Sequence, residues 1–198
     1  MMSKEIKKLI EDTKPLRLNV GCGLTKLPGF ISVDKVKEVR PDIVADFEKG
    51  LPMFKDNSVD YILADGVMEH IKDLGKVMEE FYRICKPNAV IEIIVPYFAS
   101  AGAFQDPTHT RFFTEHTFDY FQRGKQKRAY YAFKCDYDVV EVKYDFLPLF
   151  KYLPFKKKLG HIFINIITRL QFKIRAVKPA RDMSKLSHTS KSWKDIHN

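Results

Sequence analysis

The sequence of 198 residues has little cysteine and no long apolar run, and both shortages restrict what the protein can be. Its three cysteines are odd in number and lack metal-ligand spacing, which indicates reduced thiols in a cytoplasmic protein. Residues 1–14 are charged throughout, so we expect no secretion signal. The longest apolar stretch, residues 159–170, is about half of the ~20 residues that a membrane span needs, and it contains His161 and Arg169. We therefore expect no transmembrane segment.

Glycine is missing where one nucleotide-binding pattern requires it. Residues 16–23 form an apolar run that ends in Gly21-Cys22-Gly23, but Lys26 stands where the dinucleotide pattern GxGxxG has its third glycine. The next acidic residue that ends a strand-like run, Asp34, also comes much earlier after the glycines than the roughly 20 positions of a dinucleotide fold. Both departures disfavour NAD and FAD.

Short apolar runs alternate with turn signals through the first half of the chain. They cover residues 16–20, 30–33, 42–45, 59–64 and 89–95. Each is of strand length, and the last is rich in β-branched residues, as buried parallel strands are. A clear helix, residues 73–86, lies between the last two runs because apolar residues recur there at helical spacing. The alternation predicts a doubly wound, mostly parallel α/β sheet with its ligand at the carboxyl ends of the strands.

Acidic residues stand at the ends of the second and third runs. Asp34 ends the second, where a carboxylate can accept both ribose hydroxyls. Asp46 and Phe47 end the third, where a polar group and a ring can flank an adenine. The pattern therefore predicts a nucleoside site.

In this combination the segments resemble the class I S-adenosylmethionine-dependent methyltransferases, in particular small bacterial and archaeal members associated with cell-surface glycan synthesis. The segments, in order, are LNVGCG (18–23), PGFISVD (28–34), residues 42–71, residues 79–96 and FQDPTHTRFFTEHTFDYF (104–121). The resemblance implies a Rossmann-like, seven-stranded sheet that is mostly parallel, with an antiparallel last strand and helices on both faces. It also implies S-adenosylmethionine as the cofactor and O-methylation of a sugar or glycan precursor.

The resemblance further implies which residues bind the cofactor. The glycine turn would approach the methionine end, Asp34 would hold the ribose, and the exit of the fourth strand would line the site. The implied cofactor residues are Gly21, Cys22, Gly23, Asp34, Asp46, Phe47, Ala64, Asp65 and Gly66. The stretch between the turn and Asp34 is too short for a full crossover helix, so we expect a loop or one helical turn there.

Methyl transfer to oxygen needs groups that position the acceptor and take its proton. Histidine suits this task because its unperturbed pKa is about 6.5. We expect His109 to be the base, with His70 as second choice and Asp106 and Tyr97 nearby. The structural alternatives are that His109 only packs against its neighbours and that His70 only hydrogen-bonds the loop. A divalent metal on Asp106 and the two histidines is also conceivable, but we predict no metal site.

The excess positive charge belongs to the second half of the chain. Residues 1–100 carry 15 basic against 16 acidic side chains, and residues 101–198 carry 19 against 9. This predicts an anionic partner: a phosphorylated substrate, a membrane face or, less favoured, nucleic acid. The basic cluster at residues 123–131 contains two tyrosines, but we interpret it as a solvated connection rather than a nucleic-acid surface.

Residues 134–144 and 169–177 predict the sixth and seventh strands as an antiparallel hairpin, with the insert of residues 145–169 before the last strand. The insert has apolar residues at helical spacing and three consecutive lysines, 156–158. A helix packed on the sheet, a dimer surface and a basic element on an anionic membrane all stay open. The membrane version suits a lipid-linked saccharide acceptor and peripheral contact with the inner membrane face.

We thus expect one methyltransferase domain, residues 1–178, that begins with a short helix within residues 1–14. A polar tail, residues 179–198, is expected to be flexible. A metabolite or lipid acceptor, and a cofactor-binding module without catalysis, are the alternative functions; a nucleic-acid methyltransferase is less favoured. Composition does not predict the oligomeric state.

Overall fold

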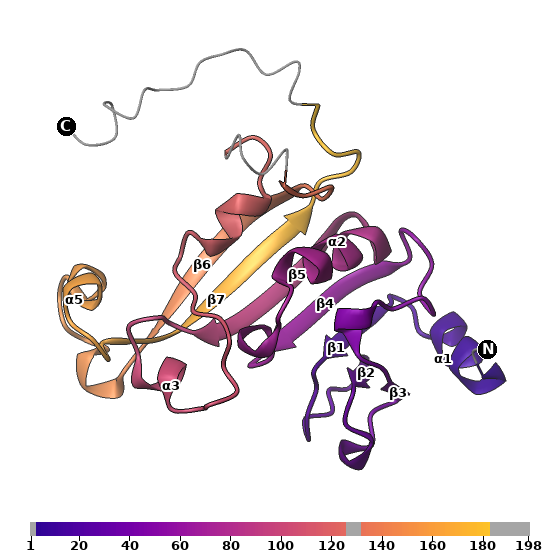
Figure 1. Ribbon diagram of the computed structural model, residues 1–198, viewed down its shortest axis with the longest axis horizontal. Helices are drawn as coiled ribbons and strands as arrows, with labels where there is room; N and C mark the ends of the chain where they lie inside the picture. Colours follow the sequence, from indigo (N-terminus) through magenta and orange to yellow (C-terminus); the bar gives the residue numbers. More distant parts are fainter. Residues whose placement is uncertain (1–2, 126–131, 183–198) are drawn as a thin grey trace.

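The computed structural model describes residues 3–125 and 132–182, and a single seven-stranded sheet organises them (Figure 1). The strands are β1 (Arg17–Val20), β2 (Ile31–Asp34), β3 (Ile43–Val44), β4 (Val59–Asp65), β5 (Cys85–Pro96), β6 (Tyr137–Phe146) and β7 (Ile167–Ala176). Their order is β3-β2-β1-β4-β5-β7-β6. Neighbours among β1 to β5 are parallel, whereas β7 is antiparallel to both β5 and β6. The predicted mostly parallel sheet with an antiparallel last strand is confirmed.

Short helices connect these strands. The α-helices are α1 (Lys4–Asp12), α2 (Leu74–Ile84), α3 (Ala101–Phe104) and α5 (Lys156–Ile162). The 3-10 helices are Lys37–Val39, Phe47–Lys49, Met68–His70, Thr117–Phe121 and Pro148–Phe150. Helix α2 begins as predicted, because the Asp73 side chain accepts a hydrogen bond from the Lys76 backbone N–H at 2.9 Å. Turns join β1 to β2, as the short spacing there predicts.

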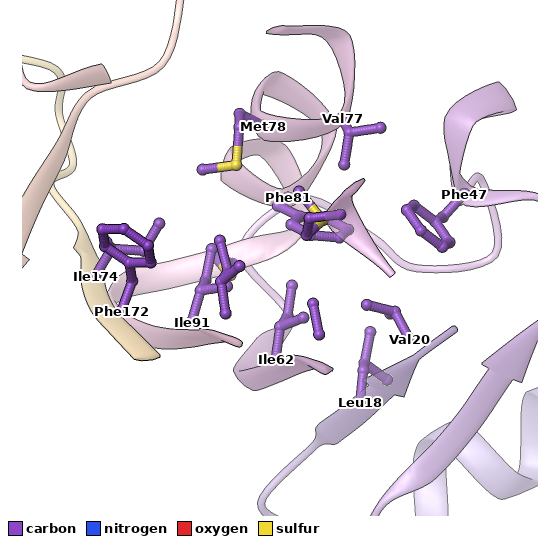
Figure 2. Packing of buried hydrophobic residues seen from close by; sticks show 14 of the residues in the cluster. Leu18, Val20, Phe47, Ile62, Val77, Met78, Phe81, Ile91, Phe172 and Ile174 are labelled. Carbon is purple, nitrogen blue, oxygen red and sulfur yellow. The ribbon is translucent and has the colours of Figure 1, made fainter. Parts of the chain in front are cut away.

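The core lies between α2 and one face of the sheet. Figure 2 shows Phe81 of α2 above side chains from β1, β4 and β5, including Val20, Ile62 and Ile91. From Ala89 to Pro96 of β5, buried side chains alternate with half-buried ones, so the two faces of the sheet are covered unequally. The strand order reverses between β1 and β4, and parallel sheets bind ligands at such a point, beyond the carboxyl ends of the strands.

One predicted helix differs from the structure. The apolar period of residues 159–170 does not form one helix, because α5 ends at Ile162 and β7 begins at Ile167. Helix α5 ends because Phe163 takes an extended conformation, with φ −111° and ψ 142°. Pairing with β5 and β6 then holds the following apolar residues as a strand.

Other expectations concern the chain ends and the basic cluster. Helix α1 packs Ile6, Leu9 and Ile10 partly against the core. Residues 126–131 of the basic cluster and 183–198 of the predicted flexible tail lie outside the described residues. The described start of the tail is attached to the sheet, because the Arg181 guanidinium binds the Asp136 carboxylate at 2.6 Å. Across residues 3–125 and 132–182, no helix has the length and apolar character needed to cross a bilayer.

Candidate active site

The glycine turn after β1 has the backbone conformation that its sequence predicts. Gly21 and Gly23 have φ angles of +63° and +50°, a region that favours glycine. A Cβ on Gly21 would lie 2.2 Å from Cγ2 of Val67, so a side chain has no room at this position. A Cβ on Gly23 would meet no atom within 4 Å. The turn is therefore pressed against the chain that follows β4 at one glycine and open to a ligand at the other.

The carboxylate of Asp34 lies beside this turn. Its Oδ2 accepts a hydrogen bond from the Gly23 backbone N–H and its Oδ1 accepts one from Val36, both at 2.9 Å. Each carboxylate oxygen has a second lone pair, so both can still accept a hydroxyl. The neighbouring Cys22 thiol is buried, and burial together with the charge of Asp34 raises its pKa. Cys22 thus shapes the turn as a neutral thiol.

The structure uses Asp46 and Phe47 differently from the prediction. The Asp46 side chain caps the 3-10 helix Phe47–Lys49 by accepting from the Glu48 N–H at 3.2 Å, and its other oxygen lies 3.5 Å from Nζ of Lys49. The ring of Phe47 is only 6% exposed and packs in the core, with its centroid 5.9 Å from that of Phe81 (Figure 2). The Asp46 carboxylate thus caps a helix and the Phe47 ring packs in the core, and contact of either residue with an adenine stays a prediction.

The exit of β4 forms the next part of this edge. Ala64 is buried within the sheet, whereas Asp65 is exposed and forms an ion pair with Arg169 of β7. Gly66 has a φ of +65° and donates its N–H to Ile94 O at 2.9 Å. The chain therefore makes a sharp turn at Gly66 and leaves the sheet there, between the glycine turn and β5.

Together these groups fit a ligand that contains a nucleoside. The open backbone at Gly23 admits close approach, and the Asp34 carboxylate is fixed at the end of β2 with free lone pairs. Both lie at the carboxyl ends of adjacent parallel strands.

A cavity of about 560 Å³ opens beyond Gly66, where β4 and β5 end and β7 begins. Its walls include Gly66, Glu69, Ser100, Gln105, Asn165 and Arg169. Figure 1 shows α3 and α5 at this end of the sheet. The volume suits a small molecule or one sugar unit with a substituent. The cavity is thus a second space, next to the nucleoside edge, that can take another small molecule.

Two segments that are distant in sequence meet beside this cavity. The 3-10 helix Met68–His70 supplies Glu69 and His70, and the chain after α3 returns to it. The backbone N–H groups of Thr110 and Arg111 both donate to Glu69 O, at 2.9 and 3.1 Å. This return brings His109 to His70, with ring centroids 4.7 Å apart. Two of the predicted catalytic residues are thus adjacent.

Asp106 lies on the same side, and Tyr97 does not. An Asp106 oxygen is 4.0 Å from Nε2 of His109, and hydrogen bonds from Thr108 lower the Asp106 pKa. The Tyr97 ring is buried instead, and its hydroxyl lies 3.3 Å from Nδ1 of His161. Burial, followed by the charge of Glu115, raises the Tyr97 pKa. The structure therefore places the Tyr97 hydroxyl beside His161, and a catalytic role for Tyr97 stays a prediction.

Glu69 is the residue that the sequence prediction left out. Its side chain is on the cavity wall and its residue is only 3% exposed. Oε1 lies 4.0 Å from Nε2 of His109, and Oε2 is buried with no hydrogen-bond partner among the described residues. Burial is the main reason that the Glu69 pKa is raised. Its only sequence signal was its place next to His70 after the fourth strand.

Comparison with known proteins agrees with this geometry. Residues 22–93 match a family model described as a methyltransferase domain. The seven-stranded sheet described above is the class I methyltransferase fold. No curated protein sequence matches the chain significantly.

Solved structures, methyltransferases among them, superpose on most of the chain. An S-adenosylmethionine-dependent methyltransferase from Archaeoglobus fulgidus is 18% identical, with a TM-score of 0.57 over 86% of this chain and 90% of the other. A variant of a 16S rRNA (adenine(1408)-N(1))-methyltransferase from Catenulisporales acidiphilia is 14% identical, with a TM-score of 0.57 over 92% and 94%. The [4+2]-cyclase SpnF is 14% identical, with a TM-score of 0.55 over 89% and 80%. At these identities the methyltransferase fold is shared, and the reaction has to be argued from the site.

Proposed function

We propose that this protein transfers a methyl group from S-adenosylmethionine to an oxygen of a sugar or glycan precursor. The observation that carries the proposal is the presence of two sites at the same edge of the sheet. The Gly23 turn with Asp34 lies at the ends of β1 and β2, and the cavity lined by Gly66 and Glu69 lies where β4 and β5 end. The methyltransferase family model over residues 22–93 supports S-adenosylmethionine as the occupant of the first site.

The cofactor supplies an already activated methyl group, so the chain has to hold the acceptor and release its proton. Glu69 lies on the cavity wall, and His70 and His109 lie next to it. The arrangement favours an acceptor whose attacking atom is a hydroxyl, because a hydroxyl must lose its proton to become an ether.

The surface beside the cavity favours an acceptor linked to a lipid. We call residues 147–166, which join β6 to β7, the tip. Apolar side chains of the tip face outward: Leu149, Tyr152 and Ile164 are 80%, 88% and 74% exposed. These exposures argue against the alternative in which the whole insert packs on the sheet. The tip also supplies two walls of the cavity, Leu147 and Asn165.

The charge of the tip suits an anionic membrane surface. Lys151 and lysines 156–158 belong to it, and residues 147–166 include no acidic side chain. Lys156 and Lys157 lie over the rings of Phe146 and Tyr144, with Nζ 4.9 and 4.4 Å from the ring centroids. Exposed apolar groups among cations are typical of peripheral membrane binding. A tip seated on lipid would hold the cavity mouth close to a lipid-linked saccharide.

Methyl transfer with paired acceptors tests the proposal. The purified protein is given S-adenosylmethionine labelled in its methyl group, with either a polyprenyl-diphosphate-linked saccharide or the same saccharide free. We expect label in the saccharide part of the lipid-linked compound and much less in the free saccharide. Label in neither compound, but in RNA supplied in parallel, would contradict the proposed acceptor class.

A further inference from the structure

We propose that Glu69, His70 and His109 form a binding site for one divalent transition-metal cation beside the acceptor cavity. One ligand atom from each residue can be chosen so that all lie within 4.8 Å of one another. Two histidines with one carboxylate are a ligand set that Mn²⁺, Fe²⁺ and Zn²⁺ accept, with other positions left open. This departs from the prediction of no metal site, which considered Asp106 rather than Glu69.

The carboxylate of Glu69 gives the first independent reason. Its Oε2 is buried and has no hydrogen-bond partner within the part of the chain that the structure describes. A buried carboxylate oxygen without a partner costs free energy unless a proton or a cation compensates it. The basic side chain beside Glu69 is His109, whose Nε2 is 4.0 Å from Oε1, beyond hydrogen-bond distance. The Glu69 carboxylate therefore has the environment of a metal ligand.

The hydrogen bond of His109 leaves the correct nitrogen free. Nδ1 lies 2.9 Å from Ala103 O, and because a carbonyl oxygen only accepts, Nδ1 carries the proton. Nε2 then keeps its lone pair, and that atom faces Glu69 and Asp106, each 4.0 Å away. Metal-ligating histidines commonly donate their second N–H to a backbone carbonyl in this way.

A chain of hydrogen bonds likewise leaves the Nε2 lone pair of His70 free. The Thr108 hydroxyl donates to Oδ1 of Asp106 at 2.6 Å, so its oxygen is left to accept from His70 Nδ1, 2.9 Å away. Nδ1 of His70 therefore carries a proton and Nε2 has the lone pair. Asp106 thus acts as an outer carboxylate that orients His70 rather than as a ligand. Both histidines are prepared to bind a cation through Nε2.

The distances require only a small contraction. Ligands about 2.1 Å from a cation lie roughly 3 to 4.2 Å apart, compared with up to 4.8 Å here. Glu69 is also on the cavity wall, so the open positions of a bound cation would face the acceptor. Its role in catalysis rests on the proposed function: a cation there would lower the pKa of a bound sugar hydroxyl. Binding of the cation itself does not depend on that function.

Binding of Mn²⁺ to the full chain, followed by electron paramagnetic resonance without cofactor or acceptor, tests the site. We expect one equivalent to bind to the wild type, and the isosteric variants Glu69→Gln and His109→Gln to bind at least tenfold more weakly. Asp106→Asn should weaken binding by about tenfold, as outer-shell partners do. His116→Gln, outside the cluster, is the matched control and should bind as the wild type does. Circular dichroism establishes that each variant is folded.

Three results would overturn the inference: no Mn²⁺ or Zn²⁺ binding by the wild type at about 1 mM, unchanged binding by folded Glu69→Gln, or equal loss in His116→Gln. Binding of S-adenosylhomocysteine, measured on the same samples, separates this inference from the proposed function. Cofactor binding without Mn²⁺ binding would overturn only the metal site. Mn²⁺ binding without cofactor binding would overturn only the methyltransferase proposal.

Discussion

The carboxylate of Asp34 accepts a hydrogen bond from the backbone N–H of Gly23 at 2.9 Å, which joins the ends of β1 and β2. The same residue that can bind a ribose thus also fixes the turn that admits the rest of a cofactor. Loss of the Asp34 carboxylate should consequently affect both the shape of the turn and its ligand. Val67, in the chain that follows β4, lies against Gly21 and so contacts this turn.

Replacement of the two turn glycines separates steric clash from backbone strain. Gly21→Ala should lower the free energy of unfolding by about 2–4 kcal/mol, because it adds a clash with Val67 to a positive φ. Gly23→Ala has the strain without the clash and should cost about 1 kcal/mol. Gly102→Ala, whose Cβ would meet only ordinary contacts, is the control. Urea unfolding gives the three values, and equal losses at Gly21 and Gly23 would contradict the packing described here.

Anionic vesicles test the tip. The wild type should float with vesicles that contain phosphatidylglycerol at low salt, and Lys156→Ala/Lys157→Ala/Lys158→Ala should reduce the bound fraction several-fold, since each lysine near an anionic surface contributes about 1 kcal/mol. Lys4→Ala/Lys7→Ala/Lys8→Ala removes the same charge from exposed positions of α1 and should bind as the wild type does. Equal loss in both triple variants would indicate a nonspecific charge effect. A dimer in solution with no vesicle binding would favour the dimer surface instead.

Substitutions at Tyr97 and Glu69 test which of the two side chains contributes to turnover. Because the Tyr97 hydroxyl lies near His161 rather than near the cluster, Tyr97→Phe should change turnover by less than about threefold. Glu69→Gln should lower turnover by about 100-fold or more while S-adenosylhomocysteine affinity is kept, since it alters proton removal and not cofactor binding. Steady-state kinetics with the polyprenyl-diphosphate-linked saccharide as acceptor gives both values. A large loss in Tyr97→Phe with a small one in Glu69→Gln would indicate that Tyr97, and not Glu69, contributes to catalysis.

The attachment of Arg181 to Asp136 predicts a pH-dependent contribution to stability. Burial raises the Asp136 pKa, but hydrogen bonds from Arg181 and from backbone N–H groups lower it further, to a net value below the ordinary 3.8. The ionised form is therefore favoured in the folded state, and its contribution is present above pH 3.8 and lost as the pH falls through the lower folded pKa.

Asp136→Asn should thus destabilise the protein by about 1–3 kcal/mol at pH 7, and the difference should shrink below pH 4. Urea unfolding at a series of pH values measures it. Asp12→Asn, an exposed substitution in α1, is the control for general charge effects. A difference between wild type and Asp136→Asn that stayed constant down to pH 3 would contradict the linkage.

Local patterns in the sequence sufficed for the sheet and the nucleoside edge. Strand-length runs, the capped helix α2 and the positions of Gly21, Gly23 and Asp34 all depend on residues that are close in sequence. The direction of side chains was harder to predict. Tyr97 continues the alternation of Ile93 and Val95, which are buried on the covered face of β5, so the period of two already indicated its burial.

Long-range contacts account for the remaining differences. The role of Glu69 emerges only when residues 109–111 return to the end of β4, a contact across about 40 residues that no local pattern encodes. Phe47 follows a site residue, but the position of α2 decides that its ring packs on Phe81. Residues 159–170 satisfy both helical and strand patterns, and pairing with β5 and β6 favours the strand from Ile167 onward.

Calorimetric binding of S-adenosylhomocysteine tests the central claim most directly. The wild type should bind one equivalent, Asp34→Ala should lose at least tenfold in affinity as its ribose acceptor is removed, and Asp12→Ala should bind as the wild type does. Absence of binding to the folded wild type, or equal affinity in folded Asp34→Ala, would contradict the proposal that this edge of the sheet holds the cofactor.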